Sequence, residues 1–359
     1  MKFLYVAPEH VSGTLALFKS EHERRGDECR FVTFWHSRYG FPEDVCLHLP
    51  WMPDRAWVRS VRRITQPHEP STTNESRSSA NLFWKPNWPA RALFGLRDSM
   101  LWPRIGAAIR EFELASFDVI HLDGGLDFTR DARFARSMAR QGRHVVCFYH
   151  GSDLRTRGMI SAVDEVTSLR LTSEWDLLEL DQRLRYLYLP FPTDAFAPRE
   201  YRFHDPIRIG HAARNPFKGT PFVERAIRHL SATHRVELLL FRDLPHAVAL
   251  QRKRECDIFV DQLTNEAGWG YGMSSVEALA MGMPVVTNIP PRMEERLGGH
   301  PFVLAGPNDI ETVLRALIGD EARCRSLADA GRQWVQERHD VRAVGDCLYD
   351  YYRELGWLS

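Results

Sequence analysis

Short, continuous apolar runs alternate with helix-like stretches along most of the chain, and this rhythm constrains the fold more than any other feature. The runs in the first half are "KFLYVA" (2–7), "CRFVTF" (29–34), "DVIHL" (118–122) and "HVVCFY" (144–149), with helical stretches at 13–25 and 103–115. Continuous apolar runs are typical of strands that are covered on both faces in a parallel sheet. The alternation therefore predicts a doubly wound α/β sheet.

A second series of the same kind begins near residue 205. Its members are "IRIGHA", a helix at about 220–232, "VELLLF", "CDIFVD", a helix at 273–282, "PVVTN" and "PFVLA". Between the two series lies "LRYLYLPFPTDAFAPREYRF", which is rich in proline and aromatic residues and lacks a helical period, as an ordered linker does. Because 359 residues are also long for one core, we expect two similar α/β domains.

Composition excludes several classes of function. Apolar residues make up 44% and charged residues 26% of the chain, as in soluble globular proteins. The 47 basic and 47 acidic side chains cancel, so no global field favours nucleic acid. The segment "MKFLYVAPEH" lacks the pattern of a signal peptide, and no window approaches the ~20 apolar residues of a membrane span. We expect a cytoplasmic protein.

The cysteines show no Cys-x-x-Cys pair and no other metal-ligand spacing, so we expect reduced thiols and no zinc site. They are Cys29, Cys46, Cys147, Cys256, Cys324 and Cys347.

Residues 64–90 begin as a polar stretch rich in proline, serine and asparagine, for which we expect a mobile loop, and then become aromatic. The overlapping stretch 83–104 mixes aromatic and basic side chains: Phe83, Trp84, Trp88, Phe94, Trp102, Lys85, Arg91, Arg97 and Arg104. Three interpretations stay open. The stretch is a peripheral contact with anionic lipid headgroups, a helix that packs its aromatic residues inside the first domain, or an aromatic acceptor pocket.

Ligands of open parallel sheets bind beyond the carboxyl ends of the strands, and two such junctions lie in the first half. In "APEHVSG", Gly13 comes near a helix start, which alone is a weak signal. In "YHGSDLR", a strand ends at His150, and Asp153 and Arg155 follow on a turn. A histidine satisfied inside the domain is the alternative interpretation of His150, but its place at a strand end favours a ligand site.

The segment "GHAARNPFKGT" carries the most specific anion signal in the chain. A strand exits into a loop that holds Arg214 and Lys218, and Gly219 and Thr220 precede a helix. Two cations beside a helix N-terminus, with its free N–H groups and positive dipole end, are suited to a diphosphate. Two solvated surface cations are the alternative.

The loop "LTNEAGWGYGM" leads into the helix expected at 273–282. Gly270 and Gly272 lie in the loop, Ser274 and Ser275 fall where a cap is expected, and Glu277 is expected in the first turn. A carboxylate there either stabilises the helix through its dipole or accepts hydrogen bonds from two vicinal hydroxyls, as a ribose requires.

Together these segments resemble the retaining glycosyltransferases of family 4. The motifs "DVIHLDGG", "HGSDLR", "LPFPTDAFAP", "GHAARNPFKGT" and "GYGMSSVEALAMGMPVV" stand in the family's order and rough spacing. The similarity covers most of the chain after about residue 115 and the first 35 residues more loosely. It implies the GT-B fold, with two facing Rossmann-like domains, parallel sheets and an interdomain cleft. The acceptor domain would be 1–192, completed by a helix within 340–359, and the donor domain 193–339.

The resemblance also assigns roles to residues. Glu277 is similar to the acid that holds the ribose, Arg214 and Lys218 to the pair on the diphosphate, and His150 to the active-site histidine near the reacting bond. The other positions implied for donor binding are Gly13, Asp153, Gly219, Asp261, Gln262, Gly270, Tyr271, Gly272, Met273 and Ser274, with Asp261 and Gln262 near the base. Trp269 stands where many members carry a second Glu, and Glu266 replaces it only if the loop bends back.

We therefore expect a glycosyltransferase that moves a sugar from a nucleoside-diphosphate sugar to an acceptor hydroxyl with retention. Cationic side chains and a helix N-terminus would stabilise the departing diphosphate more in the transition state than in the ground state. No metal or other cofactor is expected, and the chain has no Asp-x-Asp element. The alternatives are a GT-B nucleotide-sugar epimerase and a non-catalytic nucleotide-sugar-binding protein. The sequence does not identify the base, the sugar, the acceptor or the oligomeric state.

Overall fold

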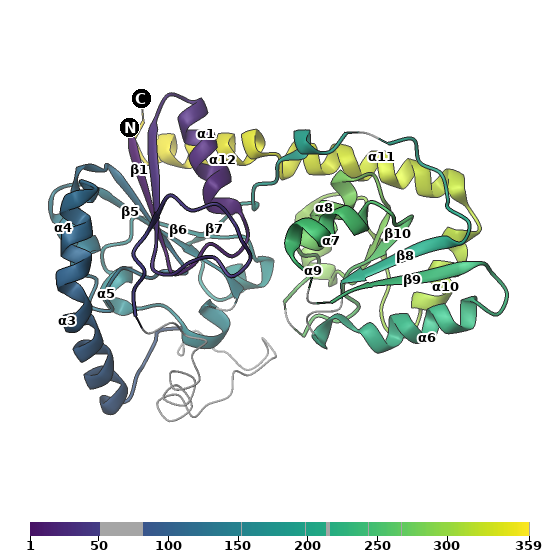
Figure 1. Ribbon diagram of the computed structural model, residues 1–359, viewed down its shortest axis with the longest axis horizontal. Helices are drawn as coiled ribbons and strands as arrows, with labels where there is room; N and C mark the ends of the chain where they lie inside the picture. The colour runs from purple at the N-terminus through teal and green to yellow at the C-terminus, as the bar shows by residue number, and fades with distance from the viewer. Residues whose placement is uncertain are drawn as a thin grey trace. The chain divides into compact units, whose positions relative to one another are not determined.

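The computed structural model describes residues 1–50, 82–151, 153–197, 199–212, 216–242, 244–266 and 268–358. The chain divides into two compact units, Met1–Leu187 and Tyr188–Ser359, each built on a parallel sheet with helices (Figure 1). Arg214 and most of the loop expected within 64–90 lie outside the described residues. Among the described helices, none combines the length and the apolar character that crossing a membrane requires.

The first unit contains a seven-stranded sheet in the order β3-β2-β1-β4-β5-β6-β7, with every pair parallel. Its strands are β1 (Lys2–Ala7), β2 (Glu28–Thr33), β3 (Val45–Cys46), β4 (Val119–Asp123), β5 (His144–Tyr149), β6 (Leu169–Thr172) and β7 (Leu184–Tyr186). The four apolar runs expected here are confirmed as β1, β2, β4 and β5. The first residues of the expected linker form β7 instead, because they pair with β6 at the sheet edge.

Helices cover both faces of this sheet. They are α1 (Thr14–Arg24), α3 (Trp88–Glu111), α4 (Arg133–Arg140) and α5 (Ser161–Asp164), with short helical turns η3 (Leu114–Ser116), η4 (Asp153–Arg157) and η5 (Trp175–Glu179). On one face, Phe18 of α1 stacks on Tyr5 of β1. On the other face, Ile105 of α3 and Met138 of α4 belong to the apolar core formed with β1, β2, β4 and β5 (Figure 1).

Helix α3 is longer than the stretch expected at 103–115. Asn87 caps it by accepting from the Ala90 N–H at 3.0 Å, and Pro103 lies inside it. Proline usually ends or kinks a helix, so the residues before Pro103 were not expected to belong to the same helix as 103–115. The side chain of Trp88 is 80% exposed, whereas Trp84 and Trp102 pack against the core.

The second unit contains a five-stranded parallel sheet in the order β12-β11-β10-β8-β9. Its strands are β8 (Ile207–Ala212), β9 (Val236–Phe241), β10 (Ile258–Val260), β11 (Val285–Thr287) and β12 (Val303–Leu304). Its helices are α6 (Thr220–Leu230), α7 (His246–Lys253), α8 (Met273–Ala280), α9 (Pro291–Leu297), α10 (Ile310–Ile318), α11 (Glu321–Arg338) and α12 (Val341–Glu354), with short turns η6 (Thr193–Ala195) and η7 (Pro216–Lys218). All five apolar runs expected here are confirmed.

Both sheets reverse their strand order next to their first strand. The chain builds β2 and β3 on one side of β1 before β4 pairs on the other side, and it builds β9 beside β8 before β10 pairs opposite. Ligands of such sheets bind at the carboxyl ends beside the reversal. The expected return of the helix around 340–356 to the first domain stays a prediction.

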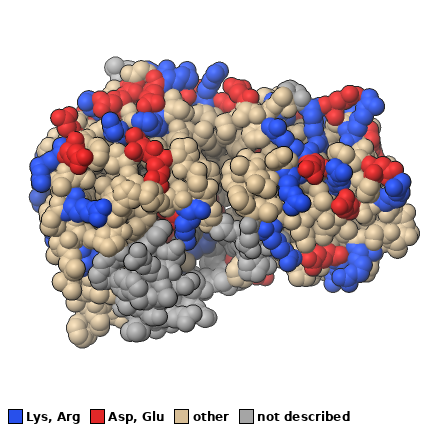
Figure 2. Space-filling view, viewed as in Figure 1, with Lys and Arg blue, Asp and Glu red and all other residues tan. Residues whose placement is uncertain are grey.

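Charge is mixed over the surface. On the face shown in Figure 2, the described basic and acidic side chains are interspersed, which agrees with the formal net charge of zero. A binding site for an anion must therefore be made by particular residues at one place.

Candidate functional site

His150 and Asp123 form a charged pair at the carboxyl edge of the first sheet. Strands β4 and β5 are parallel neighbours, with Asp123 opposite Phe148. Asp123 therefore lies beside the end of β5, and its Oδ1 is 2.8 Å from His150 Nε2. Burial opposes the charged form of His150, but the Asp123 carboxylate outweighs burial and raises the pKa of His150 to about 9. At neutral pH His150 is therefore a cation whose Nε2–H donates to Asp123.

Asp153 supports the turn that follows His150. Its Oδ2 accepts from the His150 backbone N–H at 3.2 Å. Burial raises the pKa of Asp153, although the charges of His150 and Arg157 act against this rise. Arg155 donates to Asp176 at 2.8 and 2.6 Å and to Glu174 at 2.9 Å. The "HGSDLR" turn is thus fastened to the segment after β6.

Gly13 lies at the N-cap of α1 in the left-handed region, with φ 76°. The loop before it is held by His10, which contacts the Leu15 N–H at 3.2 Å and the Pro42 carbonyl at 2.8 Å. Because β1 is the neighbour of β4 and β4 of β5, the loop of Gly13 and the His150–Asp123 pair follow three adjacent strands at the same edge of the sheet.

In the second unit, Lys218 forms an ion pair with Asp261. Asp261 follows β10 directly and also accepts from the Gly272 N–H at 2.9 Å and the Ser275 hydroxyl at 2.6 Å. Burial alone would raise the pKa of Asp261, but the Lys218 ammonium and these hydrogen bonds lower it to about 2. The segment before α6 and the loop before α8 are therefore tied to one carboxylate.

Gly219 is the N-cap of α6 in the left-handed region, with φ 81°. Lys218 just before it accepts through its carbonyl from the Leu263 N–H at 3.1 Å. The loop after β10 and the start of α6 therefore lie side by side, with Lys218 between them. The Lys218 ammonium thus lies at the N-terminal end of α6, where the helix dipole is positive.

Glu277 forms a buried cluster with two residues of α7. One carboxylate oxygen lies 3.0 Å from His246 Nε2, and the other accepts from Lys253 Nζ. Glu277 is 8% exposed and Lys253 is 2% exposed. Burial would raise the pKa of Glu277, but the Lys253 ammonium and the His246 hydrogen bond lower it below its usual value. Glu277 is therefore a carboxylate at neutral pH.

The structure corrects two expectations about the start of α8. The N-cap is Gly272, with no side-chain cap, so Ser274 and Ser275 do not cap the helix; Ser275 donates to Asp261 instead. The first turn of α8 contains no acidic residue, so Glu277 lies beyond it. Pairing with Lys253, rather than the helix dipole, is the main electrostatic contact of Glu277.

The other expected donor-binding residues mostly shape this loop. Gln262 donates to the Gly268 carbonyl at 3.1 Å and accepts through its own carbonyl from the Asn288 N–H at 2.8 Å. Gly270 has φ 80°, and a Cβ there would lie 2.3 Å from the Met293 side chain. A larger residue is therefore disfavoured both by the backbone conformation and by the clash with Met293.

Tyr271 stacks on Phe302, and its hydroxyl lies 3.0 Å from His339 Nε2. Met273 begins α8, and the Ser274 carbonyl accepts from Lys253 Nζ at 3.3 Å. Tyr271 therefore packs into the aromatic cluster of its own unit.

The sequence analysis missed Asp123, His246 and Lys253 as site residues. Asp123 ends an apolar run and precedes two glycines, a signal that could have found it. His246 and Lys253 lie on a short helix well before Glu277, and no sequence pattern links them to it.

The expected donor residues of the second unit form two groups joined by α8. One group is Lys218 with Asp261, and the other is Glu277 with Lys253. Gly272 donates to the first group and Glu277 belongs to the second, so about 7.5 Å of helical rise separates them. His150, Asp153 and Gly13 gather at the sheet edge of the first unit.

A pocket of about 570 Å³ lies beside α3 in the first unit. Arg130 in its wall contacts the rings of Trp84 at 5.0 Å and Phe94 at 4.9 Å. Arg91, Arg133 and other basic residues also line it. Part of the stretch 83–104 thus packs inward, and part lines a basic, aromatic pocket; contact with a membrane stays a prediction.

Comparison with known proteins gives structural matches only. No protein-family model matches the chain, and no curated protein sequence matches it. HepE from Anabaena, in complex with UDP, is 14% identical with a TM-score of 0.58, over 99% of this chain and 100% of that chain. A second structure of HepE contains UDP-glucose.

Two further structures agree. Sucrose-phosphate synthase from Thermosynechococcus elongatus is 14% identical with a TM-score of 0.60, over 100% of both chains. The trehalose-6-phosphate synthase OtsA is 11% identical with a TM-score of 0.59, over 98% of this chain and 99% of that chain. With its two parallel sheets, this chain is an α/β protein with the GT-B fold of these structures.

Proposed function

We propose that this protein is a glycosyltransferase that takes its sugar from a nucleoside-diphosphate sugar. The observation that carries the proposal is the arrangement at the edge of the second sheet. Glu277 on α8 is buried and ionised, and it pairs with Lys253. Lys218 pairs with Asp261, and Asp261 also accepts from the N–H of Gly272, the N-cap of α8. HepE, which has the same fold, is known in complex with UDP and with UDP-glucose.

In this proposal the ribose lies against Glu277 and the diphosphate against Lys218. A carboxylate with two oxygens suits two vicinal hydroxyls, and the ribose hydroxyls would donate to Glu277 beside His246 and Lys253. Arg214 is proposed as the second cation on the diphosphate, and Asp261 and Gln262 as neighbours of the base. Gly270 and Gly272 let the donor approach the backbone.

Bond cleavage releases a nucleoside diphosphate whose negative charge grows as the sugar departs. Lys218 and the positive end of the α6 dipole stabilise that charge more strongly in the transition state than in the donor. The Asp261 carboxylate holds Lys218 in place. The positive charge thus comes from the protein, and we propose that transfer does not require a divalent cation.

His150 is proposed to act on the donor sugar and the reacting bond. Since Asp123 keeps the ring protonated, His150 donates hydrogen bonds to an oxygen of the sugar or to the departing phosphate. We further propose that the anomeric configuration is retained and that the acceptor hydroxyl belongs to a ligand of the first unit, for which the pocket beside Arg130 is the candidate region.

The first experiment is a thermal-shift screen of nucleoside diphosphates and their sugars. A ligand at about 100 times its dissociation constant adds ~2.7 kcal/mol of stability, which shifts the melting temperature measurably. The ligand found in this way then serves as donor in transfer assays, where product NMR reports the anomeric configuration. Turnover that is equal with and without Mg²⁺ or Mn²⁺ is the expected result.

Variants test the assignment of residues. Lys218→Ala is expected to lower turnover about 10²–10³-fold, as loss of a donor to a developing anion does. Lys2→Ala, which removes an exposed lysine paired with Glu28, is the matched control and should keep full activity. Full turnover in Lys218→Ala would contradict the proposal.

One observation favours a second candidate, a nucleotide-sugar-binding protein without catalysis. Trp269 stands eight positions before Glu277, where the sugar-contacting Glu of the resembling family is absent. Donor binding by calorimetry, with neither hydrolysis nor transfer over a broad acceptor panel, would favour this candidate. Sugar isomerisation without any acceptor would instead indicate an epimerase.

A further inference from the structure

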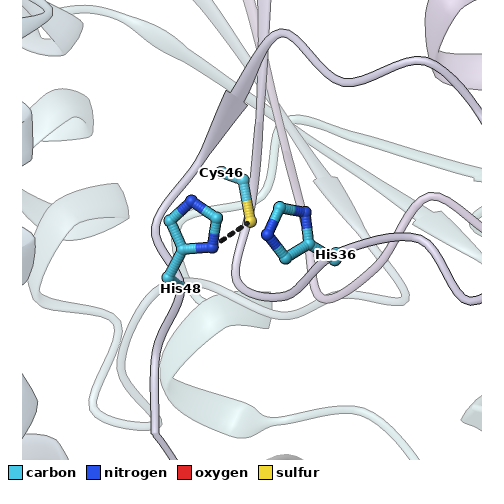
Figure 3. A group of neighbouring side chains, drawn as sticks. All are labelled: His36, Cys46 and His48. Carbon is cyan, nitrogen blue, oxygen red and sulfur yellow. Dashed lines mark hydrogen bonds between the residues drawn. The ribbon is translucent and has the colours of Figure 1, made fainter.

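His36, Cys46 and His48 lie together beyond the carboxyl ends of β2 and β3 in the first unit (Figure 3). Each residue offers one ligand atom, and the three atoms lie within 4.8 Å of one another. Figure 3 shows the three side chains pointing toward a common centre, with the Cys46 sulfur between the two imidazole rings. None of the three belongs to the donor or active-site residues proposed above.

The spacing of two of these atoms matches metal coordination. Cys46 Sγ lies 3.6 Å from His48 Nδ1. A tetrahedral zinc ion with a Zn–S bond of ~2.3 Å and a Zn–N bond of ~2.0–2.1 Å requires a sulfur–nitrogen separation of about 3.6 Å. A metal can therefore bind this pair with little movement, and the exposed His36, whose ligand atom lies within 4.8 Å of the other two, completes the set by a side-chain adjustment.

Cys46 and His48 lie on the segment that begins with β3. Val45, Leu47 and Leu49 of this segment are buried, whereas Cys46 is half-buried and His48 is exposed. The Leu47 and Leu49 N–H groups donate to the Thr33 and Phe34 carbonyls, each at 2.9 Å. The backbone that carries two of the ligands is thus fixed by the core and by β2.

The backbone at His48 is unusual. Its φ is 48°, a region that residues other than glycine rarely adopt and that costs of order 1 kcal/mol. This conformation accompanies the approach of the His48 ring to the Cys46 sulfur.

Glu43 orients His36 as a carboxylate orients a metal-binding histidine. The Nδ1 of His36 lies 2.8 and 2.7 Å from the two oxygens of Glu43, and Glu43 also accepts from the Ser37 N–H at 3.0 Å. The other ring nitrogen, Nε2, faces the Cys46 sulfur in Figure 3. Metal-bound histidines commonly pair their second nitrogen with a carboxylate in this way, which fixes the tautomer and the ring orientation.

We propose that His36, Cys46 and His48 bind a transition-metal ion of the Zn²⁺ class, with the fourth position left to water or an external ligand. One thiolate and two imidazoles are the ligand types that zinc selects, and three protein ligands are typical of zinc sites that keep an open position. The sequence predicted no zinc site, because its cysteines show no Cys-x-x-Cys pair and no other metal-ligand spacing.

The test is a Co²⁺ titration of the full-length protein after metal removal with a chelator. Tetrahedral Co²⁺ bound to a thiolate gives a sulfur-to-cobalt charge-transfer band and strong visible bands, which report the ligands directly. We expect both signals to saturate at a single equivalent of Co²⁺ and to disappear when Zn²⁺ is added. Absence of the charge-transfer band would overturn the proposal.

Variants locate the metal. Cys46→Ser is expected to abolish the charge-transfer band, whereas Cys347→Ser, which removes a half-buried cysteine of the second unit, should keep it. A band that persists in Cys46→Ser would overturn the proposal, because the metal would then bind elsewhere. Circular dichroism checks the fold. As a measurement free of variants, Zn²⁺ should protect Cys46 of the wild type from alkylation, and unprotected Cys46 would contradict the site.

Glu43→Gln tests the orienting carboxylate. Loss of such a partner typically weakens metal binding about 10- to 100-fold, so we expect the Co²⁺ affinity to fall by that factor while the charge-transfer band persists. His36→Ala should weaken Co²⁺ binding at least as much, and the matched control His234→Ala should leave the affinity unchanged. Unchanged affinity in His36→Ala would overturn the three-ligand set.

Discussion

The charged pair of the first unit and that of the second unit are built in different ways. His150 and Asp123 follow two adjacent strands of one sheet, lie 2.8 Å apart and are partly exposed. Glu277 and Lys253 belong to two helices, and both are almost fully buried. Each pair puts a defined charge at the carboxyl edge of a parallel sheet, the first a cation on His150 and the second a carboxylate on Glu277.

The two pairs therefore depend on different features of the fold. Sheet topology alone brings His150 and Asp123 together, and water still screens them, so their contact mainly sets the pKa of His150. Packing of α7 on α8 brings Lys253 to Glu277, and the absence of water makes each charge depend on the other. The first pair should therefore respond to pH and the second to the loss of a partner.

The largest effect is expected for Lys253→Met. This change leaves Glu277 buried beside His246 alone, and removing one member of a buried pair costs about 3–5 kcal/mol. Urea unfolding of the full chain measures the loss. Lys2→Met, which breaks an exposed pair with Glu28, should cost far less, because water screens an exposed ion pair.

The double variant Lys253→Met/Glu277→Leu should regain most of that stability, because apolar replacement of a whole buried pair is often neutral. Equal losses of stability for Lys253→Met and Lys2→Met would show that the Glu277–Lys253 pair behaves like an exposed ion pair, which would contradict this account.

The next effect is a pH dependence in Asp123→Asn. The folded pKa of His150 is about 9 and the unfolded value is about 6.5. Stability from the charged His150 is therefore fully present below pH ~6.5 and is lost as the pH rises through ~9. The wild type should exceed Asp123→Asn by about 3 kcal/mol near pH 6, where both His150 and the Asp123 carboxylate are charged, and this difference should fall as the pH rises through ~9.

NMR titration of the His150 ring checks the cause. Its pKa should fall in Asp123→Asn, because burial then acts without the opposing carboxylate. An unchanged pKa would mean that the neighbouring Asp123 carboxylate does not raise the pKa of His150.

A smaller effect is expected at Gly125, which follows β4 close to Asp123. Its φ is 62°, and a Cβ would lie 2.3 Å from the buried ring of Tyr149. Gly142 has φ 76° with nothing within 4 Å of a Cβ. Both Ala variants carry the backbone cost, so thermal unfolding should place Gly125→Ala about 1–3 kcal/mol below Gly142→Ala through overpacking. Equal stability would show that Tyr149 moves aside.

The smallest effect is expected for Tyr271→Phe. This variant removes the hydroxyl that bonds His339 and keeps the ring stacked on Phe302, so the loss should be about 1 kcal/mol. Denaturant unfolding measures it. Unchanged stability together with weaker donor binding would instead assign the hydroxyl to the donor.

The sequence predicted most of the fold because the strands are continuous apolar runs. "KFLYVA" and "IRIGHA" became β1 and β8 with the expected bounds. The errors arose where local rules compete with tertiary packing. Pro103 suggested a boundary inside what is one helix, Trp88–Glu111, and Leu184–Tyr186 pairs with β6 although it lies at the start of a stretch that resembles a linker.

The candidate site was predictable only where a residue follows a strand or precedes a helix. His150, Lys218 and Asp261 satisfy that rule. The partners that control them do not, because Lys253 reaches Glu277 from a different helix and Lys218 reaches Asp261 across a loop. Burial and counter-charge are properties of the packed chain, so the pKa values and the ion pairs could not be predicted from spacing.

The central claim is that Lys218 and its surroundings hold the diphosphate of a nucleotide sugar. Isothermal titration calorimetry with UDP, GDP, ADP and dTDP tests it most directly, on the wild type, Lys218→Ala and Lys2→Ala. We predict that at least one diphosphate binds the wild type and Lys2→Ala equally, and Lys218→Ala about 10- to 100-fold more weakly, as loss of a hydrogen bond to a charged group implies. Equal affinity in all three proteins, or binding of none of the four nucleotides, would contradict the claim.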